Sequence, residues 1–444
     1  MRLRFALSVI VALLLGVVSM PMATAVEGDP PNEASFGPAV SADGRWIAFV
    51  SKASNLLGGD PWINPDGVTH VFLVDTDTST IWLVSGAGGV LGNGNSKDVA
   101  ISADGRFVVF ETAATNLVPA DANNATDIVL FDRESGNLTL VSRRGAAGAQ
   151  GDGDSFAPTI SNDGTKVAFA SRATNLVGND TNGTADIFVR DFVAGVTTRV
   201  STSSTGGQAN NVSDNGVIAP TGAFVALSSK ASNLVVGDTN GERDVFLKNL
   251  TSGKTTRVSV SNGERQARGS SGLQDISDGG RSIVFTSFAA NLVKNDGNGT
   301  GDVFVRDRVG ATTIRASRRG AIEGNDESFD AAISDDGRFV VFRTKATNLD
   351  LTTDDNGKVD VYEYRVDTKE VVRISIDVAG GWTDGDSDDA AIAGDGSVVA
   401  FASVATDLVV GDDNGDGDVF VHSWTDDARI ERVVSWWSGV LPAA

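Results

Sequence analysis

The chain has 444 residues and a formal net charge of −22, because 58 acidic residues outnumber 36 basic ones. This charge argues against nucleic acid and anionic membranes as partners, since both would repel the protein. The absence of Cys excludes disulfides, zinc-thiolate sites and Cys nucleophiles. A content of 51 Gly against 10 Pro, with 41% hydrophobic residues, predicts an all-β protein with many tight turns and a sizeable core.

The first 25 residues have the pattern of a secretory signal. Arg2 and Arg4 precede an apolar run over residues 5–18, and the segment ends in Ala-Thr-Ala. That run is shorter than the roughly 18 to 20 residues that a membrane-spanning helix needs. We therefore expect cleavage before Val26, no membrane insertion after it, and a secreted or periplasmic protein.

A phrase of the form Ser-x-Asp-Gly-Arg, with some degenerate copies, recurs seven times after this segment. Its turn glycines are separated by 61, 59, 58, 58, 57 and 59 residues, and a second marker, Asn or Asp, follows each glycine by eleven residues. The constant distance between the two markers indicates seven copies of one unit, with insertions confined to the loops outside them. The turn glycines are Gly44, Gly105, Gly164, Gly222, Gly280, Gly337 and Gly396. The second markers are Asn55, Asn116, Asn175, Asn233, Asn291, Asn348 and Asp407.

Each copy contains four short segments with the pattern of β-strands, the first two joined by a hairpin turn at the Gly. The second and third segments are nearly continuous apolar runs, which indicates burial on both faces. A single four-stranded sheet cannot cover both its own faces, so neighbouring copies must do so. Four strands and seven copies favour a seven-bladed β-propeller with four antiparallel strands per blade, and an open solenoid is the alternative. In the third copy the strands are expected at residues 157–161, 166–171, 186–191 and 197–201.

The repeat spacing also predicts the domain organisation. A signal peptide occupies residues 1–25, a linker residues 26–34, the propeller residues 35–434, and a tail residues 435–444. The expected blades cover approximately residues 35–95, 96–154, 155–211, 212–269, 270–326, 327–386 and 387–434.

Tryptophans concentrate near the two ends of the repeat array. Copies two to five have none. We expect these side chains to seal the junction between the first and seventh blades, and the alternative is an aromatic groove for a glycan or peptide. The tryptophans are Trp46, Trp62, Trp82, Trp382, Trp424, Trp436 and Trp437.

The turn phrase, followed by Asp-x-Asn-Gly-x-x-Asp-Val-Phe, resembles the WD40-like, TolB-type β-propeller repeat, also described as PD40-like. The resemblance covers roughly residues 35–434. It implies a propeller fold, contacts with envelope proteins, and one of several roles: a protein-binding platform, a gating domain of prolyl peptidases or, rarely, an enzyme. Seven copies depart from the TolB pattern of six blades behind an α/β domain.

An acidic loop between the second and third strands is the main candidate for a metal site. In five copies it carries Asp, Asn and a turning Gly, with a further Asp three residues on. Such oxygens can wrap a hard cation such as calcium, and the loops resemble part of the calcium loops of integrin α propellers. In the other interpretation no metal is present, because Asp and Asn side chains accept backbone N–H groups and hold the turn. No cofactor is required, and calcium is possible. The candidate metal ligands are Asp180, Asn182, Asp186, Asp238, Asn240, Asp244, Asp296, Asn298, Asp302, Asp354, Asn356, Asp360, Asp412, Asn414 and Asp418.

These loops and the acidic connections between blades emerge on one face of a propeller. We expect that face to be negative, either as a docking surface for a protein or glycan of unknown identity or as the solvated surface of a monomer.

The sequence offers little for catalysis. His70 and His422 align with opposite ends of the third strand in their blades, so we do not expect them to form a His-based metal centre. There is no Gly-x-Ser-x-Gly nucleophile motif. We expect an exported, non-catalytic propeller that acts as a protein- or ligand-binding scaffold. The alternative is a carbohydrate-active enzyme, a glycosidase or lyase, that uses carboxylates in the central pocket.

Overall fold

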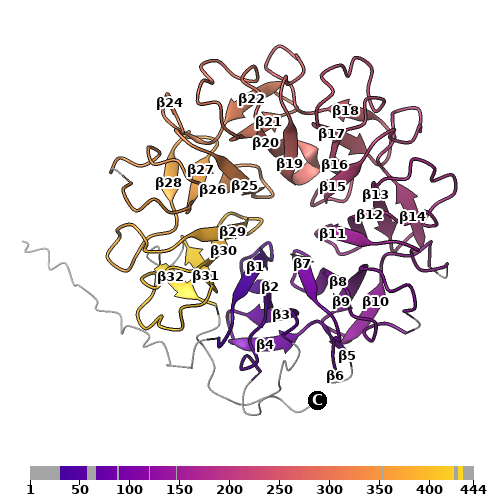
Figure 1. Cartoon of the computed structure of the whole chain (residues 1–444), viewed down its shortest axis with the longest axis horizontal. Coiled ribbons are helices and arrows are strands. Elements are labelled where there is room, and N and C mark those ends of the chain that lie inside the picture. The colour runs from indigo at the N-terminus through magenta and orange to yellow at the C-terminus, as the bar shows by residue number, and fades with distance from the viewer. Residues whose placement is uncertain are drawn as a thin grey trace, which may run out of the picture.

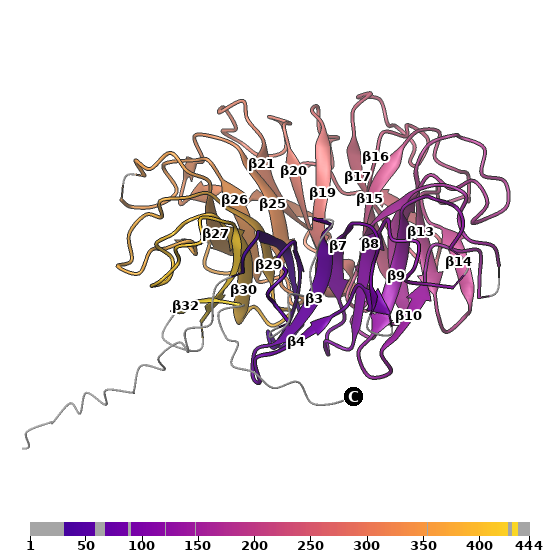
Figure 2. The same ribbon diagram turned by 60° about the horizontal axis from the view of Figure 1, so that its bottom comes forward.

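The computed structural model describes residues 31–57, 67–87, 90–119, 121–146, 148–352, 354–424 and 429–433. The predicted signal segment, residues 435–444, Trp62, Trp436 and Trp437 lie outside them. The described chain forms seven four-stranded antiparallel sheets, arranged as blades around a central axis (Figure 1). The tilted view in Figure 2 shows the strands running between the two faces of the ring. The predicted seven-bladed β-propeller is thus confirmed. None of the helical structure in these residues is long and apolar enough to cross a membrane.

Every blade is built from four strands that follow one another in the sequence, and none of the described strands is exchanged between blades. Two small hairpins and one 3-10 turn, η1 (Asp278–Gly280), complete the described elements. The blades are β1 (Ser35–Val40), β2 (Trp46–Ser51), β3 (His70–Asp75), β4 (Thr80–Leu83); β7 (Ser96–Ile101), β8 (Phe107–Thr112), β9 (Asp127–Asp132), β10 (Asn137–Leu140); β11 (Ser155–Ile160), β12 (Lys166–Ser171), β13 (Asp186–Asp191), β14 (Val196–Arg199); β15 (Ser213–Ile218), β16 (Phe224–Ser229), β17 (Asp244–Asn249), β18 (Thr255–Arg257); β19 (Ser271–Ile276), β20 (Ser282–Ser287), β21 (Asp302–Asp307), β22 (Thr312–Arg315); β25 (Ser328–Ile333), β26 (Phe339–Thr344), β27 (Asp360–Arg365), β28 (Val371–Arg373); and β29 (Ser387–Ile392), β30 (Val398–Ser403), β31 (Asp418–Ser423), β32 (Arg429–Arg432). The hairpins are β5 (Gly86–Ala87) with β6 (Val90–Leu91) and β23 (Arg318–Arg319) with β24 (Ile322–Glu323).

The middle strands of each blade form the core, as their apolar runs predict. In the third blade, for example, Phe169 of β12 lies opposite Phe188 of β13, and the two rings stack at 5.9 Å. Both side chains are fully buried. They pack in one cluster with Val109 and Ile128 of the second blade, so the core is formed between blades rather than within one. Neighbouring sheets therefore cover each other's faces, which a single sheet could not do.

The Ser-x-Asp-Gly turn explains why its glycine recurs. In the second copy, the Ser102 hydroxyl donates to Asp104 at 2.7 Å and accepts the N–H of Phe107 at 2.9 Å, which fixes the turn between β7 and β8. Gly105 adopts φ +66°, and a Cβ there would lie 2.1 Å from the ring of Trp46 in the first blade. The glycine is required both by the left-handed backbone and by the close approach of the neighbouring blade.

The second marker, eleven residues later, holds the connection between blades. The Asn175 side chain accepts the N–H of Asp152 at 3.1 Å and donates to the carbonyl of Gln150 at 2.9 Å. The same pair of bonds recurs at Asn116, Asn233, Asn291 and Asn348. One amide thus satisfies two backbone groups of an irregular segment, which gives the marker a structural role.

The ring closes where β1 of the first blade meets the seventh. The N–H of Ser35 donates to the carbonyl of Gly417 at 2.7 Å, and that of Asp395 donates to Ala42 at 3.1 Å. Apolar side chains fill this junction, among them Phe49 and Val419.

The described tryptophans do not lie at that junction, so the sealing prediction is wrong for them. Trp46 and Trp82 pack against the second blade, with their rings 5.4 Å apart. Trp424 of the seventh blade donates to Glu363 of the sixth at 2.9 Å, and Trp382 lies 3.4 Å from the guanidinium of Arg373. Among the residues that the structure describes, aliphatic side chains and Phe pack blade seven on blade one.

Candidate functional site

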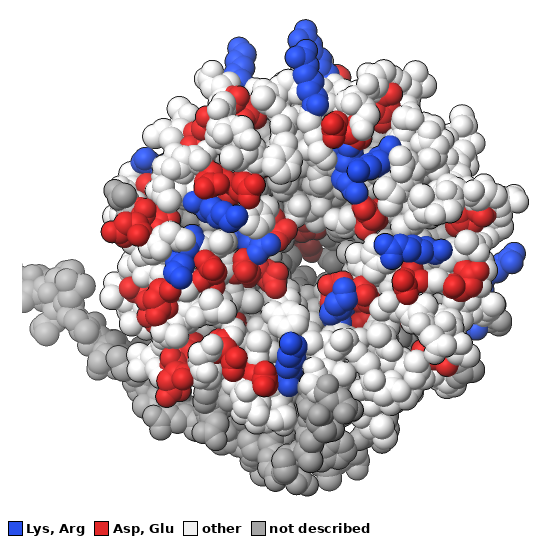
Figure 3. Space-filling model, in the orientation of Figure 1, with Lys and Arg blue, Asp and Glu red and all other residues white. Residues whose placement is uncertain are grey.

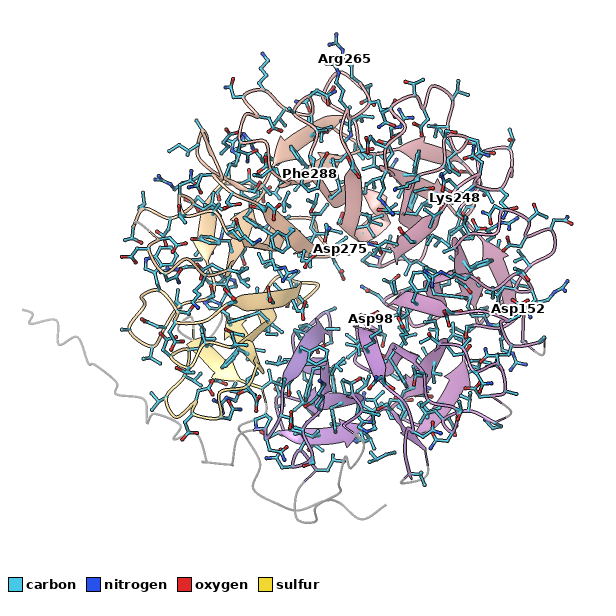
Figure 4. All side chains as sticks on the ribbon, viewed as in Figure 1. Asp98, Asp152, Lys248, Arg265, Asp275 and Phe288 are labelled. Atoms are coloured by element: carbon cyan, nitrogen blue, oxygen red, sulfur yellow. The ribbon has the colours of Figure 1, made fainter. Side chains whose placement is uncertain are left out.

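The inner strands of the blades line a cavity of about 280 Å³ on the propeller axis. Figure 3 shows the central hollow, and Figure 4 places Asp275 beside it. Most of the lining is aliphatic, and no Lys or Arg of the described chain belongs to it. The polar side chains in the wall are those of Thr159, Asn162, Asp275 and Asp335.

Asp275 comes from β19 and is held at the wall by backbone donors. Its carboxylate accepts the N–H of Ile276 at 2.7 Å and, from the sixth blade, the N–H of Ile333 at 2.9 Å. Burial raises the pKa of Asp275 to about 7, although both hydrogen bonds favour its anion, and the nearby charge of Asp335 adds to the rise. Asp275 is thus a carboxyl group that can both donate and accept a proton near neutral pH.

Asp335 lies in the turn that follows β25 and reaches across the axis. Its carboxylate accepts the Asn162 amide of the third blade at 2.7 Å. A Cβ at Gly394 of the seventh blade would lie 2.5 Å from the same carboxylate, so the missing side chain makes room for it. Burial raises the pKa of Asp335, against the opposing effect of the Asn162 hydrogen bond. This bond between opposite blades crosses one end of the cavity.

Backbone hydrogen bonds between neighbouring turns surround that same end. Ala42 donates to Ala103 at 3.1 Å, Ala103 to Asn162 at 3.1 Å, and Asn162 to Pro220 at 2.9 Å. On the other side Asp278 donates to Asp335, Asp335 to Gly394, and Asp395 to Ala42. The series is interrupted at Pro220, which has no N–H to donate. The turns therefore hold one end of the cavity as a fixed rim.

Ion pairs lie at the other ends of the inner strands. Lys97 contacts Asp98 at 3.2 Å and Glu111 at 3.3 Å. Burial, followed by the effect of Asp98, raises the pKa of Glu111 to about 7. Figure 3 shows acidic and basic side chains interspersed around the opening, and the net charge of the loop face stays a prediction. Similar pairs join Arg243 with Asp214 and Arg343 with Asp330 and Asp388.

The loops predicted to bind calcium hold their oxygens in internal contacts. In the third blade, Asp186 accepts the hydroxyl of Ser201 at 2.5 Å and the amide of Gln208 at 2.9 Å. The Gln208 amide also donates to Asp180 at 2.8 Å, and the Arg199 guanidinium lies 3.3 Å from Asp180 and 3.5 Å from Asp186. A guanidinium thus supplies positive charge between the two carboxylates.

The other loops repeat this arrangement with some variation. Arg257 contacts Asp238 and Asp244, Arg315 contacts Asp296 and Asp302, and Arg432 contacts Asp412 and Asp418. In the sixth blade Arg373 pairs with Asp350, and burial raises the pKa of Asp360 to about 7. Calcium binding by these loops stays a prediction. The Asn side chain of each loop accepts, through its Oδ1, the backbone N–H of the residue two positions later. These residues are Asn182, Asn240, Asn298, Asn356 and Asn414.

The two histidines lie in separate sheets. His70 begins β3 and contacts the Ser85 hydroxyl at 3.2 Å, whereas His422 lies near the end of β31 beside the Trp424 ring. Both side chains are buried, and burial lowers the pKa of His422 to about 4. Among the described residues, no three His, Asp or Glu side chains are grouped so that they could hold a metal ion.

No protein-family model matches the sequence, and neither does any curated protein. Among solved structures, oligogalacturonate lyase from Vibrio parahaemolyticus matches with a TM-score of 0.52 and 11% identity, over 90% of this chain and 92% of that one. The β-propeller domain of the Trilobed protease from Pyrococcus furiosus matches with a TM-score of 0.56 and 11% identity, over 92% and 99%. TolB from Acinetobacter baumannii matches with a TM-score of 0.38 and 17% identity over 64% of this chain, which spans about half of that protein (54%).

These findings correct the expectation of a non-catalytic scaffold. The fold is shared with a lyase, a protease propeller and prolyl endopeptidases, the last with a TM-score of 0.55 and 11% identity, over 90% of this chain and 49% of the endopeptidase chain. At such identities the likeness is one of fold, and this fold does not restrict the protein to binding. The chain is a seven-bladed β-propeller whose structural neighbours include TolB-type proteins and propellers of enzymes.

Proposed function

We propose that the protein is a glycoside-cleaving enzyme whose active site is the axial cavity, with Asp275 as its proton-transferring group. The observation that carries this proposal is the pKa of about 7 at a carboxyl group on the cavity wall. A group that exchanges protons with substrate near neutral pH needs such a value, which an ordinary surface Asp does not have. Residues from all seven blades also converge on this axial cavity.

Two carboxyl groups are the usual means of cleaving a glycosidic bond. One protonates the leaving oxygen, and the second, as an anion, acts as base or nucleophile. In this role Asp275 is the acid. Asp335 is the second group, because it is the other carboxylate in the cavity wall and the Asn162 amide opposes the rise in its pKa that burial causes.

The lining favours a particular substrate class. Because no described Lys or Arg lines the cavity, a uronate carboxylate would meet no compensating charge there, whereas a neutral sugar needs none. A volume of about 280 Å³ is at the small end of ligand pockets. The Asn162–Asp335 bond crosses one end, so a chain terminus enters more readily than the middle of a polymer. We expect release of small sugars from the end of a neutral glycan.

A sugar substrate is compatible with this fold, because an oligogalacturonate lyase has it and is matched over nine-tenths of both chains. Another is described in complex with manganese, with a TM-score of 0.51 and 12% identity. The residues of this protein do not fit such a centre, because His70 and His422 are buried in different sheets away from the cavity. The proposed cleavage therefore relies on the two carboxyl groups of the cavity wall.

The test is product release from a panel of neutral oligosaccharides and polysaccharides, measured as new reducing ends and by chromatography of small sugars. Asp275→Asn should lower the rate at least about a hundredfold, in line with loss of a general acid or base. Asp326→Asn is the control, because Asp326 is an exposed carboxylate in the connection before β25 and does not line the cavity. Absence of any product from the whole panel, or equal rates for the two variants, would rule out this site.

We also propose that the chain is exported, on the basis of the residue pattern at positions 1–25. Expression of the full chain in a bacterial host, followed by fractionation and N-terminal sequencing, tests this. A mature N-terminus at Val26 outside the cytoplasm is the expected result. A cytoplasmic protein that retains residues 1–25 would contradict it.

A further inference from the structure

We propose that Arg143 and Arg190 form a binding site for an oxyanion of the sulfate or phosphate type at the junction of the second and third blades. This site is remote from the axial cavity and does not depend on the proposed catalytic function. Its basis is one position of the repeat that carries a buried cation in three neighbouring blades. In two of these blades oxygens of the protein compensate the cation, so they serve as a comparison for the third.

The position is the fifth residue of the third strand, which carries a buried cation in three consecutive blades. These cations are Arg190 on β13, Lys248 on β17 and Arg306 on β21, each no more than 6% exposed. Beside each one, a Thr of the fourth strand donates to a carbonyl in the segment that follows the preceding blade. The pairs are Thr197 with Arg143, Thr255 with Thr202, and Thr313 with Val260. The three environments are therefore directly comparable.

Two of the three cations have compensation within the protein. The ammonium of Lys248, labelled in Figure 4, lies 2.8–3.3 Å from five oxygens, among them the carbonyls of Thr202, Ser203 and Gly253. Arg306 forms an ion pair with Glu264, which reaches it from the preceding segment. Burial of a cation is tolerated in both places because oxygens surround it.

Arg190 differs from both. Its hydrogen bond to the Thr197 hydroxyl is 3.5 Å long, and its Nε is buried without a partner. In place of a carboxylate, the preceding segment presents a second cation, Arg143. Burial, and after it the nearby charge of Arg143, lowers the pKa of Arg190. The Nε of Arg143 is likewise buried without a partner, and its Nη2 donates to the carbonyl of Gly148 at 2.8 Å. Among the described residues neither guanidinium forms an ion pair with an acidic side chain. The charge of Asp191 raises the pKa of Arg190, but the two side chains form no ion pair.

The two arginines meet at Thr197, and each has a buried Nε without a partner. Such N–H groups are donors for a tetrahedral oxyanion, which accepts several charge-assisted hydrogen bonds at once. Such an ion would supply the negative charge that Glu264 provides in the fifth blade. Arg143 is only half-buried, so we expect an ion to enter beside its side chain.

The experiment measures thermal unfolding and calorimetric binding of the full chain with sodium sulfate and sodium phosphate, against sodium chloride at equal ionic strength. We expect a saturable rise in Tm with sulfate or phosphate that chloride does not reproduce. Arg143→Gln and Arg190→Leu should weaken binding about tenfold or more. Arg265→Ala, which removes the same charge from an exposed residue in another inter-blade segment, should leave it unchanged.

A second variant keeps the test informative if loss of Arg190 impairs folding. Arg143→Glu places a carboxylate opposite Arg190, as Glu264 is opposite Arg306. It should raise the Tm in anion-free buffer and abolish the response to sulfate. The proposal is overturned if sulfate, phosphate and chloride act alike on the unmodified chain, or if the Arg143 variants keep the full response.

Discussion

Replacement of Gly105 by Ala tests how the blades hold one another. Gly105 has φ +66°, and an added Cβ would lie 2.1 Å from Cγ of Trp46 in the neighbouring blade. An Ala in the left-handed region costs about 1–2 kcal/mol, and overpacking of a tight contact adds about 1–3 kcal/mol. We expect Gly105→Ala to lower the free energy of unfolding by about 2–5 kcal/mol.

Gly136 provides a matched control within the same blade. It has φ +68°, nearly the same as Gly105, but nothing lies within 4 Å of its added Cβ. Gly136→Ala should therefore lose only the backbone contribution of about 1–2 kcal/mol. Urea unfolding, followed by circular dichroism and tryptophan fluorescence, gives both values, and the difference between the variants isolates the contact between blades.

A third variant checks that the effect belongs to the repeat and not to one tryptophan. The Cβ of Gly164→Ala would lie 2.2 Å from the ring of Phe107, in the same turn one blade later. It should behave like Gly105→Ala. If all three variants lost the same free energy of unfolding, the reasoning would be refuted. Such a result would mean that the neighbouring blade accommodates the added Cβ at these turns without loss of stability.

Two further predictions concern buried charge. Arg199→Met should destabilise the protein by about 3–5 kcal/mol, because it leaves Asp180 and Asp186 without their cation. The control Arg172→Met removes an ion pair at the surface and should cost less than about 1 kcal/mol. Similar unfolding midpoints for the two variants would contradict this prediction. The second concerns Asp275, whose folded pKa of about 7 exceeds its ordinary value of 3.8, so the folded state binds a proton more tightly than the unfolded state. Its contribution is present below about pH 4 and is lost as the pH rises towards about 7, by up to about 4 kcal/mol. Asp275→Asn should flatten the stability profile between these values in denaturation at a series of pH values, and an unchanged slope would show that Asp275 titrates normally.

Much of the fold could be predicted from the sequence because its determinants are local. The Ser-x-Asp-Gly turn, the apolar middle strands and the Asn marker each act within one blade or on its immediate neighbour, so seven copies of the pattern indicate seven blades. The arginines that pair with the acidic loops also leave a signal, since Arg199, Arg257 and Arg315 each follow the last Asp of their loop by thirteen residues.

The candidate site depends on the ring itself. Asn162 and Asp335 are 173 positions apart and meet only because blades three and six face each other across the axis. Asp275 is one of many acidic residues, and its raised pKa comes from enclosure by strands of other blades. The tryptophans show the same limit, because their clustering at the chain ends did not indicate which neighbour they would contact. Repetition along the sequence determined the blades, whereas closure of the ring decided which side chains share the cavity, since contacts across the axis join residues with no fixed spacing in the chain.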